Sequence, residues 1–411
     1  MAQVLTEEVV GAMNSKALID LTEQYSAHNY APLEVVLRSG DGAWVEDVDG
    51  KRYLDFLAAY SALNFGHRNP RLLKVAHQQL ETLTLTSRAF FSETFALACR
   101  DLALLCRKDK VLFMNSGAEA VETAVKAVRK WGYEVKGIPH DRAEIVVCRD
   151  NFHGRTTTIV GFSTSDESRA GFGPFASGFR VVDHGDAAAL EEAITENTAG
   201  VIFEPIQGEA GIIIPPVGYV AAVREICTRR NVLMVADEIQ SGLCRTGKLF
   251  ACDHENVQPD MYILAKSLGG GIVPVSAIAA NDEIMNVFSP GTHGSTFGGN
   301  PFASAIVREV VALIREEKPE DRSAQLGVYG LERLTGMKLG VVSEIRGSGL
   351  WFGIDIDPAA GKAKDFCKKL KYEGVLCKDT RQQTIRIAPP LTISKDDLDI
   401  GLQTIAAVLA S

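Results

Sequence analysis

The sequence predicts an α/β protein with a large domain, built on a mostly parallel sheet flanked by helices, and a smaller α+β domain. The first observation is a series of short apolar runs that alternate with helical stretches between about residues 110 and 264. The second is a change of pattern over roughly the last hundred residues, where helices alternate with strand pairs. The third is the length of 411 residues, which is too great for one simple core.

The N-terminal segment, residues 1–50, is predicted to pack with the smaller domain. A short helix is expected near residues 15–25. A hairpin-like stretch follows, in which Gly40–Gly42 and Asp49–Gly50 supply turn signals between β-rich runs.

The large domain is predicted to span residues 51–305. Its strands are expected at five apolar runs, which are Val111–Met114, Glu144–Cys148, Gly200–Glu204, Val232–Ala236 and Met261–Leu264. Because neighbouring parallel strands present their carboxyl ends at the same edge of a sheet, the polar residues that follow these runs are expected to meet there.

The small α+β domain is predicted to span residues 306–411. A helix over Phe302–Glu316 leads into it, and a strand pair follows around residues 344–355. A helix near residues 362–373 and a strand at Thr384–Ile387 complete the pattern. This mixture differs from the regular strand–helix alternation of the large domain.

Composition narrows the classes of function. A formal net charge of −9 argues against a nucleic-acid or anionic-membrane surface. No apolar run approaches the roughly 18–20 residues of a membrane span. The eight cysteines contain no Cys-x-x-Cys pair, so we expect free thiols in a reducing compartment and no zinc site. The first residues lack the layout of a signal or transit peptide, and a cytoplasmic protein is expected.

Two polar residues at strand ends point to a cofactor. Lys266 follows the run Met261–Leu264, and Asp237 follows the run Val232–Ala236, 29 positions upstream. A lone lysine after a strand is usually a loop residue, but this separation fits one crossover between neighbouring parallel strands. A converging amine and carboxylate suit pyridoxal 5′-phosphate. The lysine would form a Schiff base with its aldehyde, and the acid would keep the pyridine nitrogen protonated so that the ring accepts electrons.

Two segments could bind a phosphate. Ser116, Gly117 and Ala118 lie at a strand-to-helix turn, where free backbone N–H groups and the helix dipole favour an anion. Ordinary helix capping is the alternative, and the nearby Lys266 and Asp237 favour the phosphate. Ser295 and Thr296 lie in a loop rich in small and hydroxylated residues, which could donate to a phosphate or form a plain glycine-rich turn.

Further candidates follow other predicted strands. Phe152 and Arg155 combine an aromatic ring with a fixed cation, which suits ring stacking and carboxylate recognition. The alternative is that Phe152 belongs to the core and Arg155 to the surface. Glu204 and Glu209 flank a turn just after a strand, so they face the same sheet edge as the lysine.

Other motifs are not supported. Gly171–Ala176 formally matches Gly-x-Gly-x-x-Ala, but it contains Pro174 and no amphipathic helix follows, so a dinucleotide site is not expected. The sequence contains neither a phosphate-binding loop of nucleotide hydrolases nor the Gly-x-Ser-x-Gly elbow of serine hydrolases.

These blocks, in this order, resemble the class III aminotransferases of fold type I, a pyridoxal-phosphate-dependent family that acts on ornithine, acetylornithine or 4-aminobutyrate. The resemblance covers residue 28 to near the C-terminus and is strongest to the ornithine branch. It depends on six segments, which are His28–Tyr30, Ala59–Asn64, Thr84–Phe90, Arg129–Tyr133, Glu204–Gly211 and Ile385–Pro390. Two departures are His153, where mitochondrial relatives have tryptophan, and Phe65, where glutamine is common.

The resemblance implies a role for each matching residue. Lys266 and Asp237 match the catalytic lysine and the pyridine-nitrogen partner. The remaining cofactor contacts would be Gln240 to the ring hydroxyl, Phe152 on the ring, Gly117 and Ala118 to the phosphate, and Ser295 and Thr296 to the phosphate of a neighbouring subunit. The last pair implies a homodimer. The substrate residues would be Tyr30, Tyr60, Arg155, Glu209 and Arg386.

The activity implied is transfer of the δ-amino group of ornithine to 2-oxoglutarate, which gives glutamate 5-semialdehyde, cyclising to pyrroline-5-carboxylate, and glutamate. Acetylornithine and 4-aminobutyrate aminotransferases are alternatives within the family. Tyr60 argues against both, because its phenol offers a partner for the polar α-carbon end of ornithine. An aminomutase of the same fold would need no oxo-acid acceptor. A pure cofactor-binding or scaffold protein is the last alternative, and an absorbance band near the aldimine wavelength would exclude it.

Overall fold

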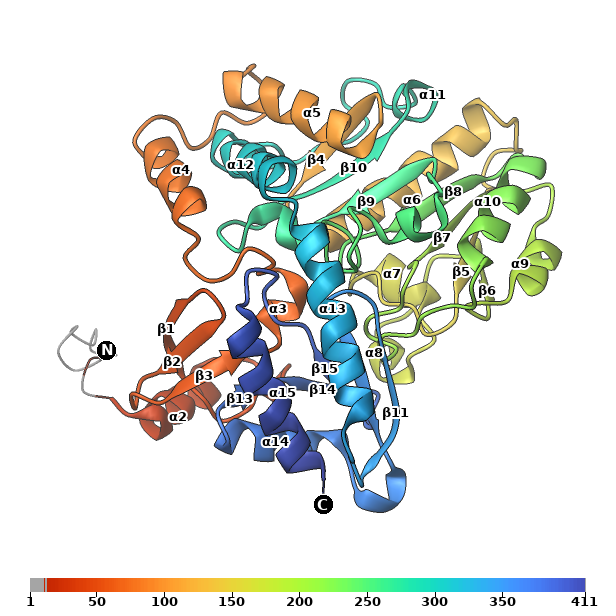
Figure 1. Cartoon of the computed structure of the whole chain (residues 1–411). Coiled ribbons are helices and arrows are strands. Elements are labelled where there is room, and N and C mark those ends of the chain that lie inside the picture. The colour runs from red at the N-terminus through yellow and green to blue at the C-terminus, as the bar shows by residue number, and fades with distance from the viewer. Residues whose placement is uncertain (1–10, 12, 411) are drawn as a thin grey trace.

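The computed structural model describes residues 11 and 13–410. A seven-stranded sheet with helices on both faces is its largest sheet (Figure 1). Its strands, in spatial order, are β4 (Lys110–Met114), β10 (Ser276–Ala280), β9 (Met261–Leu264), β8 (Leu233–Asp237), β7 (Thr198–Phe203), β5 (Glu144–Cys148) and β6 (Phe179–Val182). All pairs from β9 to β6 are parallel, whereas β10 runs antiparallel to both of its neighbours. The predicted mostly parallel sheet and its five predicted strands are confirmed.

Helices bury both faces of this sheet, which explains why its strands are continuous apolar runs. Leu233 and Val235 of β8 pack in a cluster with α6 (Gly117–Glu134). The alternate residues Met234 and Ala236 pack in a second cluster on the other face. That second cluster includes residues of α5 (Glu93–Cys106), α10 (Tyr219–Arg229) and α12 (Pro301–Glu317).

Shorter helices complete the surroundings of the central sheet. They are α4 (Pro70–Leu80), α7 (Thr157–Phe162), α8 (Asp166–Arg169), α9 (Ala187–Ala193) and α11 (Asp282–Met285), with 3₁₀ turns η1 (Ala251–Glu255) and η2 (Lys266–Gly269). α4 lies beside α12, where Arg71 Nε is 2.6 Å from Glu309 Oε1.

The chain ends share a second sheet. After α2 (Ser15–Tyr25), the strands β1 (Leu37–Asp41), β2 (Trp44–Asp47) and β3 (Arg52–Asp55) form an antiparallel meander, and β13 (Val375–Leu376) adds in parallel to β3. The hairpin predicted around Gly40–Gly42 and Asp49–Gly50 is confirmed. A short turn, α3 (Ala58–Ser61), follows β3 directly.

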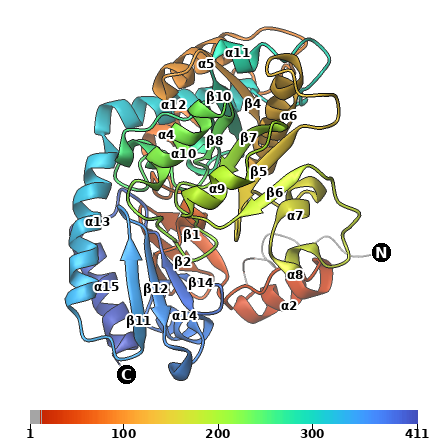
Figure 2. The same cartoon turned by 90° about the vertical axis from the view of Figure 1, so that its right-hand side faces the viewer.

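The C-terminal part contains a third, antiparallel sheet with helices packed beside it (Figure 2). Its strands are β11 (Val342–Gly347), β12 (Phe352–Ile356), β15 (Thr384–Ile387) and β14 (Lys378–Thr380). The helices are α13 (Pro319–Gly336), α14 (Ala363–Tyr372) and α15 (Lys395–Leu409), with the 3₁₀ turn η3 (Pro358–Ala360). α12 spans the predicted domain boundary at residue 305. The division of the chain into an N-terminal segment, a large domain and a small domain, at residues 50 and 305, remains a proposal.

None of the helices in the described part of the chain is both long and apolar enough to cross a membrane.

Candidate active site

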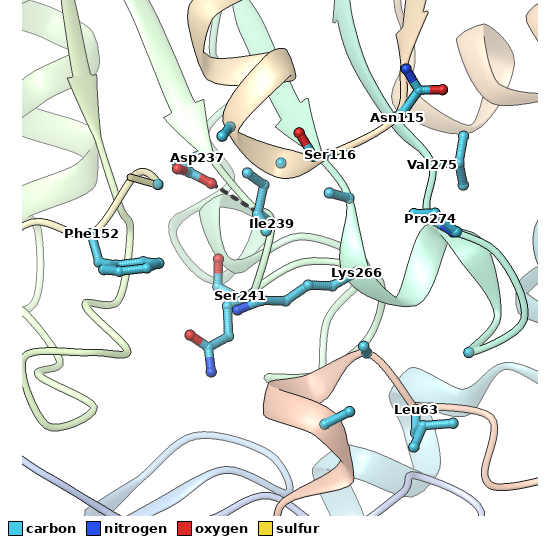
Figure 3. A pocket seen from close by; sticks show the side chains of 18 of the residues that line it. Leu63, Asn115, Ser116, Phe152, Asp237, Ile239, Ser241, Lys266, Pro274 and Val275 are labelled. Carbon is cyan, nitrogen blue, oxygen red and sulfur yellow. Dashed lines mark hydrogen bonds between the residues drawn. The ribbon is translucent and has the colours of Figure 1, made fainter. Parts of the chain in front are cut away.

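A cavity of about 740 Å³ opens at the carboxyl ends of the central strands, and Figure 3 shows its lining. Asp237 ends β8 and Gln240 follows it, Lys266 follows β9, and Phe152 follows β5. The rest of the wall comes from the start of α6 and from the segments after β3, after β7 and before β10. The predicted convergence of Lys266 and Asp237 is confirmed, because β8 and β9 are parallel neighbours.

Lys266 reaches into the cavity from the first residue of η2, and its backbone is left-handed with φ of 51° (Figure 3). Burial disfavours the ammonium and lowers its pKa to about 8, although the charge of Glu209 raises it in part. An ordinary lysine has a pKa near 10.4, so the neutral, nucleophilic amine is more abundant here by roughly a hundredfold near pH 7. The site thus supplies an amine suited to attack an aldehyde.

Asp237 is held from two sides. Its Oδ1 accepts the backbone N–H of Ile239 at 3.0 Å, which Figure 3 shows, and its Oδ2 lies 2.6 Å from His153 Nδ1. Asp237 is only 4% exposed, and the side chain of His153 is fully buried. Burial disfavours the imidazolium, but the hydrogen bond and charge of Asp237, with the charge of Glu204, raise the pKa of His153 above its ordinary value. His153 Nδ1 donates to the Asp237 carboxylate and so fixes its orientation.

His153 is the residue whose role sequence reasoning missed, whereas Glu204 lines the cavity with Lys266, at the sheet edge where it was predicted. The sequence noted His153 only as a departure, although a histidine beside a stacking aromatic could have suggested a partner for the acid. Glu204 Oε1 accepts the backbone N–H of Phe152 at 2.9 Å. Burial raises the pKa of the Glu204 carboxyl to about 7. Figure 3 shows that the Phe152 ring extends into the cavity toward Lys266, so Phe152 is not a core residue.

The start of α6 forms a narrow cradle. Ser116 and Glu119 form a capping box, in which the Glu119 carboxylate accepts the Ser116 N–H at 2.6 Å. The following N–H groups, of Gly117 and Ala118, lie at the positive end of an 18-residue helix. A Cβ on Gly117 would lie 3.1 Å from Ile239 Cδ1, so small residues are needed here. The cradle fits a phosphate, as predicted.

These residues together fit pyridoxal phosphate. The cradle would hold the phosphate, Phe152 would lie on the ring, Asp237 would face the ring nitrogen and Gln240 the ring hydroxyl. Gln240 packs over Gly208, where a side chain would collide with its amide. When bound, the cofactor supplies an electron sink that the side chains alone do not provide.

Ser295 and Thr296 are not among the residues that line this cavity. Ser295 Oγ instead accepts hydrogen bonds from Asn115 Nδ2 at 2.8 Å and from the Gly298 N–H at 3.3 Å. Phe65, the second departure noted in the sequence, is buried in the core and does not line the cavity either.

The predicted substrate residues gather beside the cofactor region. A second cavity of about 1040 Å³ shares Ala59, Leu63 and His67 with the first and is also lined by Tyr30, Tyr60 and Arg155. The Arg155 guanidinium lies 5.5 Å from the centre of the Phe152 ring. The structure therefore brings these three substrate candidates to the mouth of the lysine cavity.

Glu209 and Arg386 form an ion pair beside Tyr60, although neither of them is among the residues that line the two cavities. Arg386, in β15, is 4% exposed and its guanidinium lies 4.9 Å from the centre of the Tyr60 ring. Burial raises the pKa of Tyr60, so its phenol remains a hydrogen-bond donor at neutral pH. The predicted pairing of acid and base is confirmed as a contact.

One cavity is lined by Lys266, Asp237 and the phosphate cradle at the start of α6. This combination is typical of pyridoxal-phosphate-dependent enzymes of fold type I. The chain belongs to the class-III aminotransferase family, whose model matches residues 25–409. The protein is therefore an aminotransferase that uses pyridoxal phosphate.

Similar proteins point to one branch of that family. The ornithine aminotransferase of Geobacillus sp. (strain WCH70) is 52% identical over 393 residues, covering 96% of this chain and 98% of the relative. The ornithine aminotransferase of Brevibacillus brevis is 50% identical, with 96% and 98% coverage. Among solved structures, the ornithine aminotransferase of Toxoplasma gondii ME49 superposes with a TM-score of 0.96 at 42% identity, covering 98% of this chain and 96% of that chain.

Proposed function

We propose that the protein transfers the δ-amino group of L-ornithine to 2-oxoglutarate. The products would be glutamate 5-semialdehyde, which cyclises to pyrroline-5-carboxylate, and glutamate. The observation that carries this proposal is the contact of the Arg386 guanidinium with the ring of Tyr60, which lines the second cavity, while Arg386 is paired to Glu209. Relatives that are about 50% identical to this chain and are named ornithine aminotransferase support the proposal.

The pocket must accept two substrates of different shape. Ornithine has to present its δ-amine, and 2-oxoglutarate has to present its α-keto group. Arg386 is always charged and would bind any α-carboxylate. While Glu209 neutralises Arg386, ornithine is held at its far end by Arg155 and Tyr30 instead. The α-carboxylate of 2-oxoglutarate would then displace Glu209 and bind Arg386.

Lys266 would carry the proton in both half-reactions. When it is not bound to the cofactor, Lys266 Nζ would take a proton from Cδ of ornithine and return it within the cavity. Its lowered pKa suits this role, because a base is most effective when its pKa lies near the working pH.

A half-reaction panel tests the substrate assignment. The holoenzyme would be mixed separately with ornithine, acetylornithine, 4-aminobutyrate and lysine, without an acceptor, while the absorbance of the bound cofactor is followed. Ornithine should change that absorbance fastest. A faster change with acetylornithine or 4-aminobutyrate would contradict the proposal, and steady turnover without 2-oxoglutarate would indicate an aminomutase.

Tyr60→Ile should lower the preference for ornithine over 4-aminobutyrate by about tenfold or more. A site built to hydrogen-bond polar groups rejects analogues that leave its own groups unpaired, and the variant removes that group. The measurement is the ratio of half-reaction rates with the two amines. Tyr60→Phe is the matched control for the ring alone. A constant ratio in Tyr60→Ile would show that another residue sets the preference.

Glu209→Ala should expose Arg386 and speed the half-reaction with glutamate relative to that with ornithine, by about tenfold or more if the pair is worth over 1.4 kcal/mol. Single-turnover rates with each amino acid measure this ratio. The alternative is that the pair only stabilises the fold, and both rates would then fall in step. Glu344→Ala is a control, because Glu344 pairs with Arg346 in the sheet that also holds Arg386, and its side chain is 61% exposed.

We also propose a cytoplasmic homodimer in which Ser295 and Thr296 contact the phosphate held by the partner subunit. Exposed apolar side chains support an interface: Phe90, Phe91 and Phe297 are exposed by 71%, 94% and 56%, and Phe297 directly follows Thr296. The chain before Phe90 contacts the chain after Phe297, because the Phe302 N–H donates to Thr84 O at 3.5 Å. The eight free cysteines fit a reducing compartment. Sedimentation of the holoenzyme tests the assembly.

A further inference from the structure

The turn after β3 has an unusual backbone. Four consecutive residues, Ala58 to Ser61, have φ between 45° and 69°, and none of them is glycine. Side-chain-bearing residues adopt this left-handed region rarely and usually singly, so the surrounding structure must hold the run in place. The turn matters for the site because Ala59 lines both cavities and Tyr60 lines the second.

Asp55, the last residue of β3, holds the beginning of this turn. It is 8% exposed. Its Oδ1 accepts the N–H of Leu57 at 3.1 Å and the N–H of Ala58 at 2.9 Å, and its Oδ2 lies 2.8 Å from His67 Nε2. Oδ1 of Asp55 is thus bonded to the start of the turn, and Oδ2 is bonded to His67. Asp55 borders the second cavity, but its hydrogen bonds are directed to the protein.

His67 ties Asp55 to the neighbouring hairpin. Its backbone exchanges hydrogen bonds with Gly42, at 3.0 and 2.8 Å. Its ring lies so close to Gly40 that a Cβ there would be 2.8 Å from the ring. The orientation of the ring is therefore fixed by glycine backbone on one side and by the Asp55 carboxylate on the other.

The far end of the turn is fixed against the lysine loop. Leu63 packs on Gly271, where any Cβ would collide with the leucine side chain. Gly271 lies five positions after Lys266, so this contact sets the distance between the turn and the catalytic lysine. Asp55 at one end and Leu63 at the other leave the residues between them, Ala59 and Tyr60, in one arrangement.

We propose that Asp55 is a positioning residue for substrate choice: by holding the left-handed turn, it places the Tyr60 phenol where ornithine is recognised. The inference rests on the role proposed for Tyr60. It predicts that a residue whose carboxylate is directed away from the substrate governs which amine the enzyme prefers.

The test compares half-reaction rates of the holoenzyme with ornithine and with 4-aminobutyrate. Asp55→Ala should lower the ornithine to 4-aminobutyrate ratio by about tenfold or more, as loss of the Tyr60 hydrogen bond would. In a Tyr60→Ile background the same change should move the ratio by less than about twofold, because the two substitutions remove one shared interaction. A purely structural role would lower both rates equally and leave the ratio unchanged, which would overturn the inference.

Asp47→Ala is the matched control. Asp47 lies in β2 of the same sheet and is 6% exposed. It likewise accepts two backbone N–H groups, of Asp49 at 3.0 Å and of Lys51 at 2.8 Å, but it lines neither cavity. Its loss should lower thermal stability and leave the substrate ratio within about twofold of wild type. A ratio that falls as far as in Asp55→Ala would overturn the inference.

Asp55→Asn keeps the test decisive if Asp55→Ala does not fold. The amide retains an oxygen for the two N–H groups of the turn, so most of the substrate preference should remain. If Asp55→Asn instead lowers the ornithine to 4-aminobutyrate ratio by about a hundredfold, the loss is as large as that of a direct charge contact. Asp55 would then bind the substrate itself, and the inference would be overturned. If wild-type enzyme fails to prefer ornithine at all, the proposed function is wrong. If the wild-type enzyme prefers ornithine and the Asp55 variants show the same ratio of half-reaction rates, only the proposed role of Asp55 is wrong.

Discussion

Replacing Lys266 with alanine is expected to abolish transamination, with a fall in turnover of about 10⁴-fold or more. In the proposed mechanism the residue supplies both the covalent link to the cofactor and the proton carrier, so neither the link nor the proton transfer should survive its loss. The fold should persist, because the lysine makes its contribution inside a cavity and its removal relieves a desolvated amine.

The covalent link gives a direct readout. Reduction of the holoenzyme with borohydride should attach the cofactor mass to wild-type protein and not to Lys266→Ala. In wild type, formation of the link from apo-protein should accelerate as the pH approaches about 8 and level off above it, because only the neutral amine reacts. An ordinary lysine would continue to gain reactivity up to about pH 10.4.

Lys108→Ala is the control for removal of a buried lysine. Burial also lowers the pKa of Lys108, whose Nζ donates to the Pro259 carbonyl at 2.6 Å outside both cavities. This variant should lose stability and keep the reducible link. Turnover of Lys266→Ala near the wild-type rate would show that the lysine is not the cofactor's attachment point.

The convergence of Lys266 and Asp237 was predictable because it depends on local and general rules. Each residue ends an apolar run, and the spacing between the runs fits one crossover of a parallel sheet. α6 was predictable for the same reason, since its apolar positions recur at helical spacing behind a capping serine. Sequence reasoning succeeded where a residue's place follows from its own element.

The rest depends on contacts that are distant along the chain. β10 was missed because its small residues carry no periodic signal, and its antiparallel direction is set by the return of the chain from β9. His153 takes its role from Asp237, which lies 84 positions away. The left-handed turn Ala58–Ser61 contains no glycine, so its own sequence gives no sign of it. Such features arise only when separate elements meet.

Asp237→Asn is expected to lower the rate of both half-reactions by about 10²–10³-fold. Asp237 is 4% exposed and lies 2.6 Å from a histidine whose pKa is raised, so its charge acts in a poorly solvated region where electrostatic interactions are strong. Asparagine has nearly the same shape but cannot hold the cofactor's ring nitrogen protonated. The electron sink is therefore weakened while the lysine remains available.

The same substitution separates this role from simple capping of the strand end. Asp237 Oδ1 accepts the Ile239 N–H at 3.0 Å, and the amide oxygen of asparagine can accept it equally well. If capping were the whole function, rates would be unchanged. Glu238→Gln is the control, because Glu238 is equally buried but turns to Ser241 Oγ and the Cys252 N–H, at 2.6 and 2.9 Å. Glu238→Gln should retain the rates of both half-reactions. Asp237→Asn should keep the reducible link to Lys266 but lose most of the half-reaction rate, because the reaction requires the charge of Asp237 and not only its hydrogen bond to the Ile239 N–H.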